Sequence, residues 1–259
     1  MIKVKSICLK VITVLILSPI LSITANAQDE QTAPRLFIGG GALSENMYLE
    51  FAKLAGPDAK LVVIPTASSR EPELEKIKKR WLDRGIKDVS ILHTRDRAIS
   101  MAADFSVPLK TATVVWISGG SQQRIADAYL DTPVEKELFQ LIQRGGLIGG
   151  SSAGAAIQTK VMISGGKNPP EITTGFDLLP GAILDQHFLK RSRLGRLIQA
   201  VEMHPNLIGL GIEEDTAILI TGKEAKVLGA SYVLRFEIVE GKMKIDAFEE
   251  GEIIAILKK

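Results

Sequence analysis

A serine within a glycine-flanked pentapeptide is the residue of this sequence best suited to chemistry. Ser152 lies in Gly150-Ser151-Ser152-Ala153-Gly154, a G-x-S-x-G pattern between the apolar Leu147-Ile148 and the helix-forming residues 155–158. Small flanking residues permit the sharp strand-to-helix turn that exposes a nucleophilic serine, and N–H groups at the helix start can hold an oxyanion. The pentapeptide also fits a glycine-rich turn without a catalytic role. The choice between these two interpretations depends on whether the sequence offers a base and an acid for Ser152.

A serine hydroxyl needs a base, which is usually histidine. Of the three histidines, His187 follows the apolar Ala182-Ile183-Leu184 and is expected at a strand end. His93 follows another predicted strand and could reach the ligand crevice, but we expect a solvated loop side chain there. His204 lies at a predicted helix end, where a capping role is expected. His187 is therefore our candidate base.

The acid that orients the base has two candidate positions. Asp185 lies two residues before His187, and on an extended strand such a residue rarely folds back onto that ring. Three consecutive acids, Glu213-Glu214-Asp215, follow the apolar residues 209–212. The chain order of α/β-hydrolases would use Asp185 with His204, only 52 residues after the serine, and leaves His187 unexplained. We favour Ser152, His187 and Glu214.

Short apolar strands alternate with helices in the first two thirds of the sequence. Strands are predicted at residues 35–38, 61–64, 89–92 and 113–117, and helices at residues 44–54 and 72–84. This pattern predicts an α/β fold with a mostly parallel central sheet flanked by helices, and a ligand crevice at the carboxyl ends of its strands. Beyond Gly181 the pieces at 217–220, 225–228, 233–239 and 242–248 predict a β-rich, antiparallel C-terminal extension of the same domain.

The N-terminus predicts export. A basic segment, an apolar stretch from Val11 to Leu21 and Ala25-Asn26-Ala27 predict a signal peptide over residues 1–27, leaving a single domain over residues 28–259. An uncleaved anchor is the alternative, but the apolar stretch is short for a bilayer. We expect a periplasmic or extracellular protein without membrane contact after cleavage.

Composition narrows the chemistry of the mature chain. Its formal charge becomes −1 once the three signal lysines are removed, and the only cysteine, Cys8, leaves with the signal. Neither disulfides, cysteine catalysis nor nucleic-acid binding is expected. Gly39-Gly40-Gly41 lacks the G-x-G-x-x-G spacing, so no nucleotide cofactor is expected, and no ligand cluster predicts a metal.

Several motifs in order resemble cyanophycinase, of the S51 serine peptidase family. They are Gly149-Gly150-Ser151-Ser152-Ala153-Gly154-Ala155, Leu178-Leu179-Pro180-Gly181, Asp185-Gln186-His187-Phe188 with Arg191, Arg193 and Arg196, and residues 209–216. The resemblance implies a class I glutamine-amidotransferase-like fold, usually a homodimer. It also implies hydrolysis of cyanophycin, a poly-aspartate backbone carrying arginine on its side-chain carboxylates, to the β-Asp-Arg dipeptide.

Site roles follow from the resemblance. Ser152 would be the nucleophile, His187 the base and Glu214 its orienting acid, with oxyanion contacts from the backbone near Gly120 and Ala153. The residues implied for the substrate pocket and its support are Gln122, Asp185, Gln186, Arg191, Arg193 and Arg196. Guanidinium groups suit the carboxylates of such a polymer. An acid must receive the substrate arginine, and Asp185 or an acid near Glu213 could do so.

Departures from the family pattern keep two alternatives open. Many relatives have Asp or Asn at the position of Ser121, and often Thr at that of Ser151. An Asp-Xaa or isoaspartyl dipeptidase of the same family is one alternative, although that branch lacks the Asp-Gln-His-Phe and arginine pattern. The other is a noncatalytic peptide-binding protein of this fold, against which the three retained catalytic residues argue.

Overall fold

The computed structural model describes residues 34–256, so the predicted signal peptide lies outside the described residues. Its largest element is an eight-stranded sheet in the order β14-β11-β10-β1-β5-β4-β2-β3. Its strands are β1 (Arg35–Gly39), β2 (Lys60–Ile64), β3 (Asp88–Ile91), β4 (Val114–Ile117), β5 (Leu147–Ser151), β10 (Thr216–Thr221), β11 (Glu224–Gly229) and β14 (Ile253–Ala255). Strands β1 to β5 are parallel to one another, as the alternating pattern predicted.

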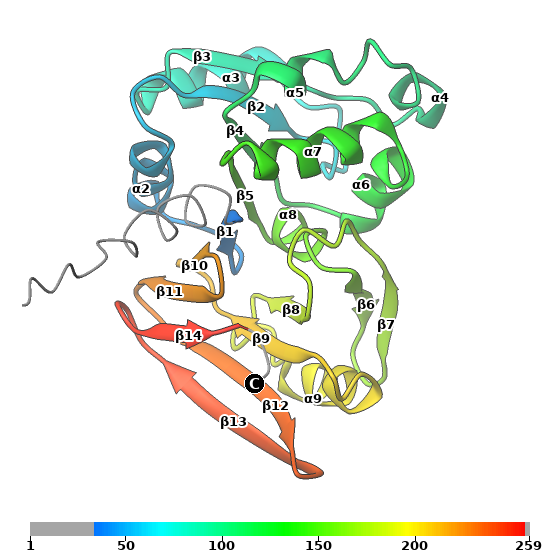
Figure 1. The fold of residues 1–259 in the computed structure, drawn as a ribbon, viewed down its shortest axis with the longest axis vertical. Coiled ribbons are helices and arrows are strands. Elements are labelled where there is room, and N and C mark those ends of the chain that lie inside the picture. Colours follow the sequence, from blue (N-terminus) through cyan, green and yellow to red (C-terminus); the bar gives the residue numbers. More distant parts are fainter. Residues whose placement is uncertain (1–33, 257–259) are drawn as a thin grey trace, which may run out of the picture.

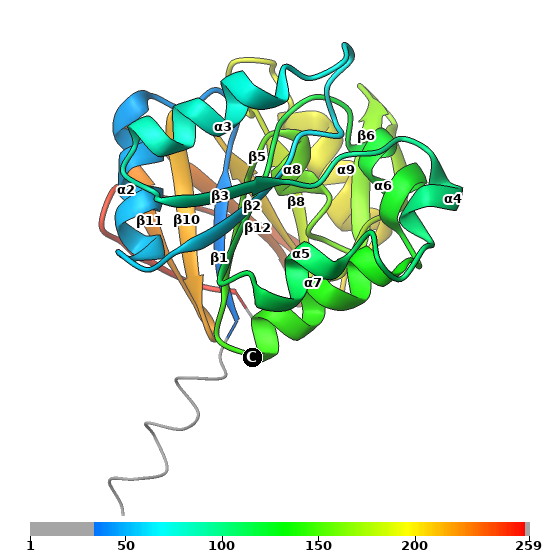
Figure 2. The ribbon, with the colours of Figure 1, turned by 90° about the horizontal axis from the view of Figure 1, so that it is seen from above.

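Helices cover both faces of this sheet, which explains why its strands are apolar throughout. On one face, Phe37 packs with the helix residues Phe51 and Trp81. On the other face, Leu36 and Ile38 join the larger core. Figure 2 shows the sheet between α3 and the pair α5 and α7. The helices are α2 (Glu45–Ala55), α3 (Leu74–Asp83), α4 (Arg97–Ser100), α5 (Val107–Thr111), α6 (Gln122–Tyr129), α7 (Pro133–Gln143), α8 (Ala153–Ala156) and α9 (Leu194–Met203).

The C-terminal third is β-rich as predicted, but its strands are shared between two sheets. Strands β10 and β11 extend the main sheet in antiparallel fashion. A second sheet has the order β13-β12-β9-β8, and Figure 1 shows it beneath the parallel strands. Its strands are β8 (Ala182–Gln186), β9 (Ile208–Ile212), β12 (Val233–Val239) and β13 (Lys242–Phe248). Strands β6 (Val161–Gly166) and β7 (Pro170–Thr174) form a separate antiparallel pair.

Backbone hydrogen bonds connect the end of β1 and the loop that follows it to strand ends of both sheets. The N–H of Ser152 donates to the carbonyl of Gly39 at 3.1 Å, and that of Asp215 donates to Ala42 at 2.7 Å. The N–H of His187, at the end of β8, donates to the carbonyl of Gly40. The loop after β1 therefore brings the ends of β5, β8 and β9 together. None of the helices described is long and apolar enough to span a membrane.

Candidate active site

Ser152 occupies a sharp turn between β5 and α8. Its backbone has φ 53° and ψ −113°, a conformation that non-glycine residues rarely adopt. The glycines on either side permit close packing: a Cβ on Gly150 would lie 2.5 Å from the Gly154 carbonyl carbon, and one on Gly154 would lie 2.6 Å from that of Ile117. The G-x-S-x-G pattern thus folds as the sharp strand-to-helix turn that the sequence predicts.

A chain of hydrogen bonds links Ser152 to an acid. Its Oγ lies 2.8 Å from His187 Nε2, and His187 Nδ1 lies 2.6 Å from Glu214 Oε1. His187 is 7% exposed, whereas Ser152 is half-buried. The structure therefore brings together the three residues selected from the sequence, in the geometry that lets an imidazole take a proton from a serine.

The environment keeps the imidazole neutral and the acid charged. Burial lowers the pKa of His187 below its usual 6.5, the nearby Arg191 and Arg193 lower it further, and the hydrogen bond to Glu214 opposes them. The pKa of Glu214 is lowered by its hydrogen bonds with Lys190 and His187. A neutral base beside an ionised acid is the state needed for general-base catalysis near neutral pH.

Three residues around the base went unrecognised in the sequence. A Cβ on Gly40 would lie 2.5 Å from the Ile212 carbonyl oxygen, and one on Gly41 would lie 2.6 Å from His187 Cε1. Lys190 Nζ contacts Glu214 Oε2. In the sequence, the triple glycine only shows that the spacing of a nucleotide-binding loop is absent. Its place directly after a strand was the available signal, whereas nothing marked Lys190 among the other lysines.

The predicted oxyanion positions flank the serine. A Cβ on Gly119 would lie 3.3 Å from Ser152 Cβ, so the loop after β4 passes beside Ser152. Gly120 has φ 142° and packs against Ala67, where a Cβ would lie 2.5 Å from the carbonyl carbon. Within residues 34–256, the N–H groups of Gly120 and Ala153 donate to no other group. Both therefore remain available as donors.

Asp185 forms a buried ion cluster with two of the predicted arginines. Its carboxylate is fully buried and pairs with Arg196 through Nε at 2.6 Å and Nη2 at 2.5 Å. Arg193 Nη1 lies 3.2 Å from the same carboxylate, and Arg196 also donates to the carbonyl of Gly166 at 2.9 Å. Asp185 is thus occupied by arginines of its own chain, which does not support the expectation that it meets a substrate arginine.

The other predicted pocket residues have differing surroundings. Gln122 is buried, and its Nε2 donates to the carbonyl of Ile163 at 2.7 Å, which holds α6 against β6. Gln186 is 4% exposed, and its Oε1 has no partner among the described residues. Arg191 is exposed, and its positive charge acts on His187. Of these three, Arg191 alone presents its side chain freely to solvent.

The two remaining histidines lie outside the hydrogen-bonded chain. His204 is the C-cap of α9, as expected, with its N–H donating to Ala200 at 3.1 Å. The prediction of a solvated His93 is wrong: its side chain is 9% exposed and its Nδ1 lies 3.0 Å from Thr66 Oγ1. Thr66 in turn lies 2.7 Å from the Tyr129 hydroxyl. A polar side chain in a loop after a buried strand can point inward when buried groups there form hydrogen bonds with it.

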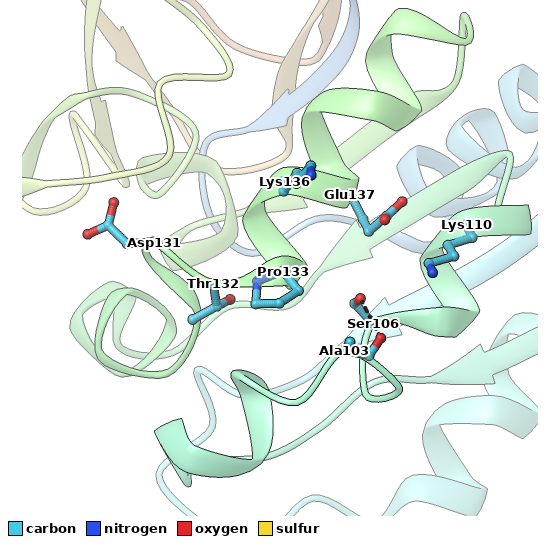
Figure 3. A pocket seen from close by; sticks show the side chains of 8 residues that line it. All are labelled: Ala103, Ser106, Lys110, Asp131, Thr132, Pro133, Lys136 and Glu137. Carbon is cyan, nitrogen blue, oxygen red and sulfur yellow. Dashed lines mark hydrogen bonds between the residues drawn. The ribbon is translucent and has the colours of Figure 1, made fainter.

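A cavity of about 470 Å³ lies elsewhere in the fold, between α5 and α7 (Figure 3). It is lined by Ala103, Ser106, Lys110, Asp131, Thr132, Pro133, Lys136 and Glu137. None of the site residues predicted from the sequence is among them. Over residues 34–256, no group of three or more His, Cys, Asp or Glu side chains could hold a metal ion.

Known proteins resemble this chain in sequence and in fold. The model of peptidase family S51 matches residues 36–228. The cyanophycinase of Geminocystis herdmanii is 33% identical over 198 residues, covering 72% of this chain and 71% of that protein. The cyanophycinase of Synechococcus elongatus is 36% identical over 192 residues, covering 70% of this chain but only 59% of that protein.

Two solved structures share the fold. A peptidase from an acI-B1 Actinobacterium superposes with a TM-score of 0.69 at 24% identity, over 87% of this chain and 98% of that one. A putative peptidase E protein from Listeria monocytogenes gives 0.52 at 20% identity, over 77% and 100%. At these identities the two structures support the fold assignment alone.

Proposed function

Because this chain belongs to peptidase family S51, we propose that it is a serine-type exopeptidase that hydrolyses cyanophycin to β-Asp-Arg dipeptides. The observation that carries the proposal is the hydrogen-bonded chain from Ser152 through His187 to Glu214, on a serine held in a rare backbone conformation. The choice of polymer is supported by two relatives named cyanophycinase. The matched segments cover 71% and 59% of the lengths of those two proteins.

The proposed reaction uses the chain's own groups. His187 Nε2 takes the proton of Ser152 as Oγ attacks the peptide carbonyl, and the N–H groups of Gly120 and Ala153 stabilise the tetrahedral oxyanion. The imidazolium then gives its proton to the leaving amine, and the C–N bond breaks. Water, deprotonated by the same imidazole, attacks the acyl-enzyme. The bond between Oγ and the acyl carbon then breaks, the imidazolium returns its proton to Ser152 Oγ, and the acid product leaves. Glu214 stabilises the transient imidazolium throughout.

The arginines divide between support and recognition in this proposal. Arg193 and Arg196 bind the carboxylate of Asp185, which lies two residues before His187, and they thereby hold the end of β8 in place. Arg191 is exposed on the same turn as His187, and its guanidinium suits the α-carboxylate of a substrate arginine. We assign substrate contact to Arg191, and the family resemblance adds Gln122 and Gln186 to the substrate pocket.

The cellular setting belongs to the same proposal. The signal-peptide pattern of residues 1–27 supports export to the periplasm or the medium, where the enzyme would act on polymer released by other cells. The family resemblance supports a homodimer. N-terminal sequencing of the exported protein and its mass in solution test these two points separately from catalysis.

The test of function compares the purified mature protein with Ser152→Ala on insoluble cyanophycin, following soluble β-Asp-Arg by mass spectrometry. Release by the wild type alone supports both reaction and nucleophile, while equal release by the variant contradicts the assignment of Ser152. If neither protein releases dipeptide, cyanophycin is the wrong substrate. Short α- and β-aspartyl peptides then test the dipeptidase alternative, and binding without cleavage would identify a noncatalytic protein.

A further inference from the structure

The orienting acid of the site has two side-chain partners, the neutral imidazole of His187 and the cationic ammonium of Lys190. Glu214 Oε1 accepts from His187 Nδ1 at 2.6 Å, while Oε2 is in contact with the ammonium of Lys190. The Glu214 side chain is 17% exposed and that of Lys190 is 63% exposed. Each oxygen of the carboxylate therefore has its own partner, which restricts rotation of the carboxylate away from the imidazole.

The backbone of Lys190 is fixed by the preceding glutamate. Glu213 Oε2 accepts from the N–H of Leu189 at 2.5 Å and from that of Lys190 at 3.0 Å. The N–H of Arg191 also donates to the carbonyl of His187 at 3.0 Å. The turn that follows the base is thus bound to the end of β9. This anchoring distinguishes Lys190 from an ordinary surface lysine, whose ion pairs contribute little.

The charges around His187 are mixed. Negative groups are Glu213 and Glu214 from the turn after β9, and positive groups are Lys190, Arg191 and Arg193 from the turn after β8. A cation beside Glu214 reduces the net negative potential at the imidazole, so protonation of His187 becomes less favourable. Without Lys190, the full charge of Glu214 would act on the ring.

We propose that Lys190 is a positioning residue, which holds the Glu214 carboxylate against His187 and offsets part of its charge at the imidazole. The catalytic part of this inference rests on the proposed function, but the coupling between Lys190 and His187 does not. Lys190 does not touch the reacting atoms, and its effect reaches them through Glu214.

The first test measures the titration of His187 by NMR, which needs no substrate. Only three histidines occur in the sequence, so their imidazole signals can be assigned by substitution. In Lys190→Met we expect the His187 midpoint to rise by about half a pH unit, and in Lys190→Arg to stay near that of the wild type. The matched control is Lys87→Met, an exposed lysine just before β3 at the opposite edge of the sheet.

The second test separates positioning from substrate binding. For Lys190→Met we expect kcat on cyanophycin to fall several-fold with little change in KM. We also expect the acid limb of the kcat/KM profile against pH to move to higher pH. An unchanged His187 titration in Lys190→Met would overturn the inference, as would a loss confined to KM. If the wild type proves inactive on every peptide tested, the proposed function fails while the NMR titration still decides the role of Lys190.

Discussion

Gly41 lies directly against the imidazole of His187, with no room between them for a side chain. A Cβ built on Gly41 would lie 2.6 Å from His187 Cε1, closer than side-chain carbons approach. The neighbouring Gly40 accepts the N–H of His187 through its carbonyl. The loop after β1 therefore packs against His187 in two ways. The Gly40 carbonyl accepts the backbone N–H of His187, and the imidazole fills the space that a side chain on Gly41 would need.

Gly41→Ala is expected to lower kcat by about 10²-fold, because the added methyl displaces the imidazole from Ser152 and small misplacements of a base are costly. The measurement is kcat on cyanophycin together with circular dichroism to verify the fold. The control is Gly165→Ala, where a Cβ would lie 2.6 Å from the end of the exposed Glu171 side chain, which can move. Wild-type activity in Gly41→Ala would contradict the assignment of His187.

Burial predicts the pH dependence of the reaction. His187 must be neutral to accept the Ser152 proton, so kcat/KM rises as pH increases through the pKa of its imidazole. Burial and the adjacent arginines lower that pKa below 6.5. The acid limb of a kcat/KM profile is therefore expected below pH 6.5. A limb centred above this value would mean that the charge of Glu214 outweighs burial.

The parallel half of the fold was predictable because each strand is a short apolar run followed by small residues. The strands predicted at 61–64 and 113–117 are observed as Lys60–Ile64 and Val114–Ile117. The second sheet was not predicted. Strands β10 and β12 are both rich in apolar residues, yet β10 pairs with β1 and β12 with β9. The periodicity of a strand reports burial but not its partner.

The central residues of the site were predictable for a related reason, since Ser152, His187 and Glu214 all follow strands that end at one place. His93 also follows a strand, yet it turns inward to Thr66 because polar partners lie beneath it. Lys190 and the occupied state of Asp185 depend on contacts across 24 and 11 residues of chain. No local pattern encodes such long-range pairing.

The buried ion cluster should be costly to break. Asp185→Asn leaves Arg196 and Arg193 without their buried carboxylate and is expected to lower the free energy of unfolding by about 3 kcal/mol or more. Urea denaturation measures this change. Asp83→Asn serves as the control, because Asp83 pairs with Lys79 at an exposed i,i+4 position and is expected to contribute at most about 0.5 kcal/mol. Equal losses in the two variants would contradict a structural role for Asp185.

In the cavity between α5 and α7, a substitution is expected to raise the free energy of unfolding. Glu137 projects from α7 into the gap toward α5 (Figure 3), is 8% exposed, and its Oε2 has no partner among the described residues. An unpaired buried carboxylate oxygen costs solvation energy that folding does not return. Glu137→Met keeps a helix-forming residue of similar length and is expected to raise the free energy of unfolding by about 1 kcal/mol.

A neighbouring glutamate on the same helix provides the matched control. Glu135 Oε2 accepts the N–H of Asp131 at 2.6 Å, so Glu135→Met loses a hydrogen bond and is expected to destabilise the protein. Urea midpoints of the two variants should therefore move in opposite directions. If Glu137→Met also destabilises, the prediction is wrong, and an ion pair with Lys110, which lines the same cavity, is the alternative to test. In that case Lys110→Met would cost as much as Glu137→Met, and the double variant would cost less than the two single losses together.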